Sequence, residues 1–203
     1  MSKLILSERR VEPVQVDPDV KAKLVRIKAR RGDTYLIGGG LIFGSLIMCP
    51  ASILNNRSNV LVEYFTEYHG KIETWGCRID DDHVYGLATL CVGYVPRTAS
   101  IVASIASNHE VMKLVQHSAN AEWESISVRV DKIVTKFFTS ADIGDPMKHP
   151  GSIGGLVFDS FDRLAGIVDG RSNGSAGNIY VTPITTMCSY MSSLEYQGII
   201  LTG

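Results

Sequence analysis

Most of the chain consists of short runs of valine, isoleucine, tyrosine, phenylalanine and threonine, separated by glycine, asparagine, aspartate and serine. Short apolar runs between turn-forming residues are typical of an all-β barrel or sandwich. The pattern predicts strands at Lys23–Ala29, Tyr35–Phe43, Leu46–Cys49, Val60–Phe65, Lys71–Ile79, Leu87–Val92, Ser125–Val130, Val134–Thr139, Leu156–Phe158, Leu164–Val168 and Ile179–Val181. We therefore expect an all-β fold.

Two segments depart from this strand pattern. In Ile101–His117 the apolar residues show no clean period of two, so we expect a connecting segment with a short helix. In Thr185–Tyr196, the residues Met187, Met191 and Leu194 are spaced by four and three, as on one face of a helix. An amphipathic helix near the C-terminal end is therefore predicted.

Composition excludes partners that are gathered by charge. The chain has 203 residues, is 45% hydrophobic and carries a formal net charge of −1, with charges of both signs mixed along it. We therefore expect a packed core and neither a nucleic-acid nor a membrane partner. The one basic concentration, from Lys21 to Arg31, alternates with apolar residues and predicts an amphipathic first strand with a solvated cationic face.

The cysteines give no sign of a metal site or a disulfide framework. No two of them are close in the sequence, so their spacing suits neither zinc ligands nor a stapled secreted domain. We interpret all of them as buried thiols: Cys49, Cys77, Cys91 and Cys188. No cofactor and no metal are expected. The apolar stretch at the N-terminus is too short for a signal peptide, so a reducing intracellular compartment, the cytoplasm or nucleus, is predicted, with an organelle as the alternative.

A motif in the C-terminal half carries a family resemblance. Residues 138–184 contain Pro-Gly-Ser-Ile-Gly-Gly at 150–155, an apolar strand, an Asp-rich hairpin, Leu-Ala-Gly-Ile at 164–167, a Gly/Ser loop and a strand that ends in Thr-Pro-Ile. This succession resembles the C-terminal barrel of HtrA/Deg (Do-like) serine proteases. The resemblance implies a chymotrypsin/trypsin-like double β-barrel with a C-terminal helix. It divides the chain into an N-terminal extension at 1–17, an N-terminal barrel at 18–107 and a C-terminal barrel with the terminal helix at 108–203.

The same resemblance extends to the N-terminal half, but the three catalytic positions carry other residues. The stretch 38–54 is similar to the family's segment that ends in the general-base histidine, and the aligned residue is Ser52. The stretch 80–92 is similar to the segment of the triad aspartate, which falls on Gly86. The nucleophile position falls on Ile153. Serine cannot act as the imidazole does, and isoleucine has no nucleophilic atom.

The glycines around the nucleophile position remain. Pro150-Gly151 and Gly154-Gly155 would turn the backbone tightly and point amide hydrogens into a shared cavity. The resemblance implies an oxyanion-like turn at Gly151, Ser152, Ile153, Gly154 and Gly155. It also implies a peptide-cleft wall at Val168, Asp169 and Gly170.

The sequence therefore predicts an inactive protease homologue, a pseudoprotease. Its expected role is to bind a protein or peptide, or to modulate an active HtrA/Deg-type protease, as a homo- or hetero-oligomer. We expect no PDZ domain, although many HtrA proteins carry one.

Two alternatives stay open at this point. One is a serine-type endopeptidase with a rearranged nucleophile, which would use Ser152 or Cys49 with His149 or His83. The other is an unrelated β-barrel or sandwich with a structural role, in which Ser52, Gly86 and Ile153 would not converge.

Overall fold

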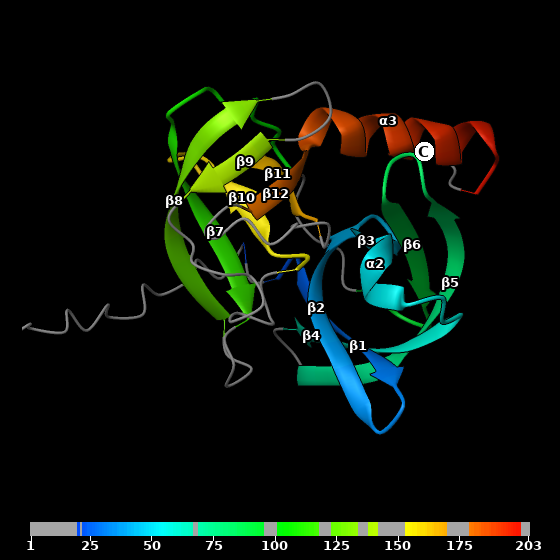
Figure 1. The fold of residues 1–203 in the computed structure, drawn as a ribbon. Coiled ribbons are helices and arrows are strands. Elements are labelled where there is room, and N and C mark those ends of the chain that lie inside the picture. The colour runs from blue at the N-terminus through cyan, green and yellow to red at the C-terminus, as the bar shows by residue number, and fades with distance from the viewer. Residues whose placement is uncertain are drawn as a thin grey trace, which may run out of the picture.

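Two six-stranded antiparallel barrels lie side by side in the computed structural model (Figure 1). The structure describes residues 20, 22–66, 69–95, 101–117, 123–133, 138–141, 153–169 and 179–199. In sequence order, strands β1 to β6 form the first barrel and strands β7 to β12 form the second. The predicted trypsin-like double barrel with a C-terminal helix is thus confirmed.

The first barrel closes in the order β1-β2-β3-β6-β5-β4. Its elements are β1 (Leu24–Arg31), β2 (Thr34–Phe43), β3 (Leu46–Pro50), the short helix α2 (Ala51–Leu54), β4 (Asn59–Thr66), β5 (Gly70–Asp82) and β6 (Leu87–Val92). Alternate residues of each strand point inward because successive side chains of a strand lie on opposite faces. Val25, Ile27 and Ala29 of β1 accordingly lie in the core of this barrel.

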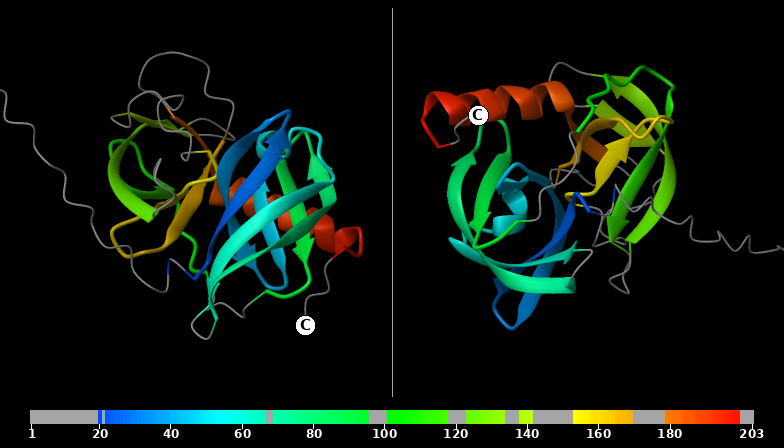
Figure 2. Two further views of the ribbon diagram at one scale, coloured as in Figure 1. Left: turned by 90° about the horizontal axis from the view of Figure 1, so that it is seen from below. Right: turned by 180° about the vertical axis from the view of Figure 1, so that it is seen from behind.

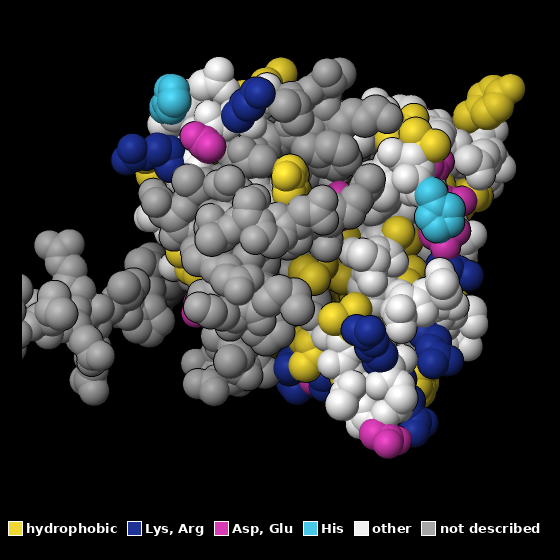
Figure 3. Space-filling view, viewed as in Figure 1, with side chains coloured by type: hydrophobic (Ala, Val, Ile, Leu, Met, Phe, Trp, Pro, Cys, Tyr) yellow, Lys and Arg dark blue, Asp and Glu magenta, His cyan; other side chains and the backbone are white. Residues whose placement is uncertain are grey.

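The outer face of β1 is less open to solvent than the sequence suggests. The carboxylate of Glu63 on β4 is only 4% exposed. Three cations bind it: Arg26 at 3.1 Å, Lys28 at 3.0 Å and Lys71 at 2.5 Å. The amphipathic first strand is confirmed, but the solvated cationic face is wrong for Arg26 and Lys28, which are neutralised by Glu63. Figure 3 shows further Lys and Arg side chains grouped around the β1–β2 hairpin.

The second barrel closes in the order β10-β11-β12-β9-β8-β7. Its strands are β7 (Val111–His117), β8 (Trp123–Ile133), β9 (Phe138–Ala141), β10 (Leu156–Phe158), β11 (Leu164–Val168) and β12 (Ile179–Pro183). Ahead of β7, residues 101–110 include a stretch hydrogen-bonded to β11: the Ser104 N–H donates to the Leu164 carbonyl and the Leu164 N–H donates to the Val102 carbonyl, each at 2.8 Å.

Strand β7 corrects the expected helix in Ile101–His117. Met112 and Leu114 lie in the core of the second barrel, whereas Val115 on the opposite face packs in the apolar cluster between the barrels. Because both faces of this strand are buried, its apolar residues do not alternate with polar ones. The period of two that would have identified the strand is therefore absent.

Helix α3 (Ile184–Tyr196) joins the barrels. It begins directly after β12 of the second barrel and lies across the first (Figure 2). Its buried residues include Ile184, Met187, Tyr190 and Leu194, as the predicted amphipathic helix requires. The Tyr190 hydroxyl donates to Asp80 at 2.7 Å and lies 2.9 Å from the Thr89 hydroxyl, so α3 is hydrogen-bonded to β5 and β6.

A buried carboxylate attaches the connecting segment to the second barrel. Asp159, at the start of the β10–β11 turn, is 1% exposed. It accepts hydrogen bonds from the Ser104 hydroxyl at 2.7 Å, the Phe161 N–H at 2.9 Å, and the N–H and Nε of Arg163 at 3.0 and 2.7 Å. Burial by itself raises the pKa of this carboxyl, but these donors outweigh it and lower the pKa to about 2.

Replacing Asp159 with asparagine is expected to lower the free energy of unfolding at neutral pH by about 1–3 kcal/mol, because the amide group would face the Ser104 and Arg163 donors. The charged carboxylate stabilises the fold above its ordinary pKa of 3.8, and this contribution is lost as pH falls toward 2. Urea unfolding at several pH values measures both effects. Asp162→Asn in the same turn, where the side chain is 44% exposed, is the control. Equal unfolding midpoints for the two variants would contradict this account.

Candidate functional site

The predicted base and acid positions meet at one end of the first barrel. Ser52 is exposed on α2, which follows β3, and Gly86 ends the turn between β5 and β6. The Ala51 N–H donates to the Gly86 carbonyl at 2.9 Å. This bond attaches α2 to the β5–β6 turn and holds the two predicted positions next to each other.

A cavity of about 420 Å³ opens at this point. Its lining combines short polar side chains, an imidazole and two carboxylates: Ala51, Ser52, Asn55, Asn56, Asp81, His83, Gly86 and Asp169. All but Asp169 belong to the first barrel and its α2 segment, and Asp169 follows β11 of the second. The cavity is therefore polar and lies where the two barrels meet.

Gly86 has a local reason to be glycine. Its φ of +70° is in the left-handed region, which residues with a side chain adopt at a cost. The Asp82 side chain accepts the N–H of Val84 at 2.7 Å, and the Gly86 N–H donates to the Asp82 carbonyl at 2.8 Å. The predicted solvated turn at Asp82 and His83 is present, and it favours glycine at the position where the family's aspartate would orient an imidazole.

Ile153 lies at the contact between the barrels and does not line the cavity. Its carbonyl accepts the N–H of Gly39 on β2 at 2.8 Å. Its side chain is half-buried and packs against the hydrophobic core of the first barrel. The isoleucine at this position therefore fills apolar space at the edge of the first core.

Backbone contacts fix the turn that follows. The Gly154 N–H donates to the Val168 carbonyl at 2.9 Å, and the Val168 N–H donates to the Gly155 carbonyl at 2.8 Å. Gly154 has φ +77°, and a Cβ added there would lie 1.9 Å from the carbonyl oxygen of Gly39. The expectation that the Gly154 amide points into a shared cavity is wrong, because β11 accepts its hydrogen bond. Gly151 and Ser152 lie outside the described residues.

The predicted cleft wall is divided by the structure. Val168 is 1% exposed and belongs to the core of the second barrel, so its side chain does not face the cleft. Asp169 is 3% exposed and lines the cavity beside Ser52 and Gly86. Gly170 lies outside the described residues.

Sequence reasoning did not select Asn55, Asn56 and Asp81, which also line the cavity. The two asparagines have φ of 46° and 60°, and asparagine tolerates the left-handed region better than most residues. The Asn-Asn pair after α2 could have predicted this turn from the sequence. Asp81 is paired with Arg78, whose Nη1 lies 2.5 Å from its carboxylate.

The proposed substitute nucleophiles have different positions. Cys49 is fully buried in the first core, and burial raises the pKa of its thiol far above the ordinary value, so the reactive thiolate is disfavoured. His83 is exposed and lines the cavity with Ser52. Ser152 and His149 lie outside the described residues.

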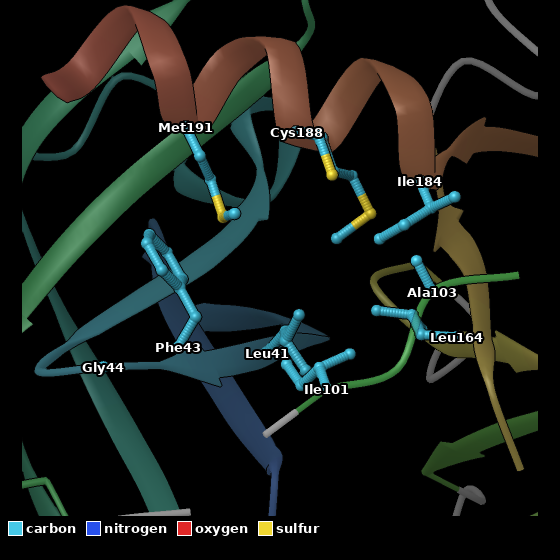
Figure 4. Close-up of a pocket in the computed structure, with 10 residues that line it drawn as sticks. Leu41, Phe43, Gly44, Ile101, Ala103, Leu164, Ile184, Cys188 and Met191 are labelled. Atoms are coloured by element: carbon cyan, nitrogen blue, oxygen red, sulfur yellow. The ribbon is translucent and has the colours of Figure 1, made fainter. Parts of the chain in front are cut away.

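A second cavity, of about 400 Å³, lies on another part of the molecule, between α3 and the two barrels. Its lining is almost wholly apolar: Leu41, Phe43, Gly44, Ile101, Ala103, Leu164, Ile184, Met187, Cys188 and Met191. Figure 4 shows Cys188 and Met191 of α3 pointing toward Phe43 and Leu41 of β2. None of the predicted catalytic positions lines it.

No protein-family model matches the sequence, and comparison with curated proteins gives no match. Solved structures do match. The active form of the Rv3671c protease from M. tuberculosis has 18% identity and a TM-score of 0.71, with 86% of this chain and 83% of that chain covered. The HtrA-type protease AlgW, solved with a tripeptide, has 15% identity and a TM-score of 0.69 over 88% of this chain and 62% of that one. Deg5 has 15% identity and a TM-score of 0.69 over 84% of this chain and 88% of that one.

The fold is that of the HtrA/Deg serine proteases. This double-barrel fold argues against a different barrel or sandwich, although Ile153 does not line the cavity that Ser52 and Gly86 share. At these identities the likeness establishes the HtrA/Deg architecture and not an activity. Among the described residues, no helix is long and apolar enough to cross a membrane.

Proposed function

We propose that this chain is a catalytically inactive HtrA/Deg-type protease homologue that binds a protein or peptide segment at the cavity beside Ser52 and Gly86. The observation that carries the proposal is that the backbone around the site resembles that of a protease, whereas the residues at the catalytic positions differ. The Gly39–Ile153 backbone bond and the shared lining of Ser52 and Gly86 support alignment with the protease site, yet serine, glycine and isoleucine stand at the three catalytic positions.

Binding does not require a triad. Removing all three triad members of a subtilisin-type enzyme lowers turnover by about two million-fold, whereas uniform binding of a peptide is independent of them. The cavity of about 420 Å³ has the size to receive one or two side chains of an extended segment. A partner could equally be an active HtrA/Deg relative, whose activity would then be modulated.

The cavity lining also supports a second candidate, a hydrolase with a rearranged site. Ser52, His83 and Asp81 are a hydroxyl, an imidazole and a carboxylate in one cavity. Two observations weigh against it. Among the described residues no hydrogen bond joins Ser52 to His83, and the Asp81 carboxylate is paired with Arg78. We therefore rank it below the pseudoprotease.

Fluorophosphonate labelling together with casein hydrolysis separates the two candidates. For the full chain at pH 8 we expect no stoichiometric labelling and no hydrolysis above that of a heat-denatured sample. Stoichiometric labelling that is abolished by Ser52→Ala or His83→Ala would establish the rearranged hydrolase instead. Labelling that survives both changes and is abolished by Ser152→Ala would establish a shifted nucleophile.

A reversion variant tests the alignment itself. Combining Ser52→His, Gly86→Asp and Ile153→Ser is expected to introduce fluorophosphonate labelling, because a serine and an imidazole would then occupy the family positions. The matched control is Ser52→His with Gly86→Asp and Ile153→Ala, which has no hydroxyl and should not be labelled. Because Gly86 has a positive φ, circular dichroism must first establish that both variants fold. Folded variants that label equally would contradict the alignment.

The proposed peptide binding is tested with ligands selected from a random peptide library on the immobilised full chain. Peptides selected by the wild-type protein should lose at least about tenfold in affinity for Ser52→Tyr, which fills the cavity mouth. They should bind Ser189→Tyr, an exposed change on α3, unchanged. Equal affinity for both variants would place binding elsewhere.

A further inference from the structure

Strand register places two cysteines directly opposite each other. In the β5–β6 ladder, Cys77 pairs with Cys91, between the pairs Gly76↔Val92 and Arg78↔Leu90. The two residues are fourteen positions apart in the sequence, so neither a zinc spacing nor a local motif reveals the pair. The cysteines have no close pair along the sequence, but the strand register brings these two residues together.

Both thiols lie on the outer face of the first barrel. A Cβ added to Gly76 would contact the Val62 and Leu90 side chains, so position 76 faces the core and position 77 faces outward. Leu90 is fully buried in the core, and its neighbour Cys91 therefore points outward as well. Cys77 is exposed and Cys91 is partly exposed, so solutes reach both.

The separation of such a pair suits a direct bond. Residues directly opposite in an antiparallel ladder have Cα atoms about 4.5 or 5.5 Å apart, with side chains on the same face. A disulfide requires Cα atoms about 4.4–6.8 Å apart, so the register meets this condition without movement of either strand. The other two cysteines are not candidates, because Cys49 is buried inside the barrel and Cys188 is on α3.

We propose that Cys77 and Cys91 are an oxidisable dithiol that forms a reversible cross-strand disulfide on treatment with a hydroperoxide. The thiolate of the more exposed Cys77 attacks one peroxide oxygen; an S–O bond forms, the O–O bond breaks and water leaves after protonation. The Cys91 thiolate then attacks the Cys77 sulfur, forming the S–S bond and expelling hydroxide, which takes up the remaining proton. Two thiols are oxidised by two electrons, and one hydrogen peroxide is reduced to two waters.

The disulfide would close the hairpin that carries the candidate site. The segment between the two cysteines includes Asp81, His83 and Gly86, all of which line the polar cavity. Oxidation would covalently restrain the ends of this hairpin. The modification thus lies on the same structural unit as the site, but it does not depend on what that site binds.

Peptide mapping of the oxidised full chain tests the proposal. The reduced protein is treated with two equivalents of hydrogen peroxide, remaining thiols are blocked with N-ethylmaleimide, and the tryptic peptides are analysed by mass spectrometry. Trypsin cleaves after Arg78, so the disulfide would link peptides 72–78 and 79–97. We expect this linked product in more than half of the molecules, with a loss of two hydrogens that dithiothreitol reverses.

Three variants complete the design. Cys77→Ser and Cys91→Ser should each abolish the linked product, whereas Cys188→Ser, which removes another exposed thiol, should leave its yield unchanged. Formation of sulfinic acid without the linked peptides, or of dimers in place of the internal link, would overturn the proposal. The labelling and peptide-binding experiments on the polar cavity are unaffected by either outcome.

Discussion

Replacing Gly154 with alanine is expected to lower the free energy of unfolding by at least about 4 kcal/mol, which places it among the most damaging single substitutions. The new Cβ would lie 1.9 Å from the carbonyl oxygen of Gly39, and the residue would also keep an unfavourable φ of +77°. The obstructing atom is backbone of the other barrel and cannot rotate away. Urea unfolding followed by tryptophan fluorescence measures the loss.

Substitutions at two further glycines separate the effect of the close contact from the effect of the positive φ. In Gly39→Ala the added Cβ would lie 2.5 Å from the Gly154 carbonyl oxygen, at the same contact between the barrels, but residue 39 has no positive φ. Gly44→Ala has a φ of +54° and nothing within 4 Å of the added Cβ. We expect a large loss for Gly39→Ala and only about 1–2 kcal/mol for Gly44→Ala. If Gly154→Ala were no more destabilising than Gly44→Ala, the close contact between the barrels would be refuted.

Replacing Glu63 with glutamine is expected to lower the free energy of unfolding by about 2–4 kcal/mol at pH 7, because three cations on β1 and β5 lose a buried counter-charge. Burial alone raises the pKa of this carboxyl, but hydrogen bonds from Lys71 and Lys28 outweigh it and lower the pKa to about 2. The stabilisation is therefore present above the ordinary pKa of 4.5 and is lost as pH falls toward 2. The difference in unfolding free energy between wild type and variant, measured from pH 7 down to pH 2.5, should shrink accordingly.

The neighbouring Glu73 provides the control for this prediction. Its carboxylate forms an ion pair with Lys28 at 3.1 Å, and its side chain is 46% exposed. Exposed pairs of this kind contribute about 0–1 kcal/mol, so Glu73→Gln should have little effect and little pH dependence. A pH-independent difference for Glu63→Gln would mean that its charge does not stabilise the barrel.

The frame of the candidate site could be predicted from the sequence because glycine has few substitutes. Gly39, Gly86 and Gly154 occur where backbone approaches backbone or where φ is positive, and both demands restrict the residue type strongly. The positions of these glycines relative to the strands therefore resemble the HtrA/Deg pattern even where the residues at the predicted catalytic positions differ from it. The lining of the cavity was less predictable, since Asn55 and Asp81 are polar residues in turns and resemble any solvated loop.

The thiols illustrate the opposite case. Sequence distance separates Cys77 from Cys91, and only the β5–β6 register brings them together. The same register makes one of them exposed and the other partly exposed, contrary to the expectation of buried thiols, which holds for Cys49 alone. Register depends on the turn and on the bulge in β5 between Arg78 and Asp80, neither of which the local pattern specifies.

The sequence by itself determined the all-β class, ten of the strands in whole or in large part, and the terminal helix. These follow from side-chain periodicity, which is local, and from glycine geometry, which few residues can replace. The three altered catalytic positions stay a prediction from the sequence. The tertiary structure decided that β7 is a strand, because the second barrel covers one of its faces and the other lies between the barrels. It also decided which polar groups share the cavity, because that depends on how the β5–β6 turn, α2 and the end of β11 meet in space.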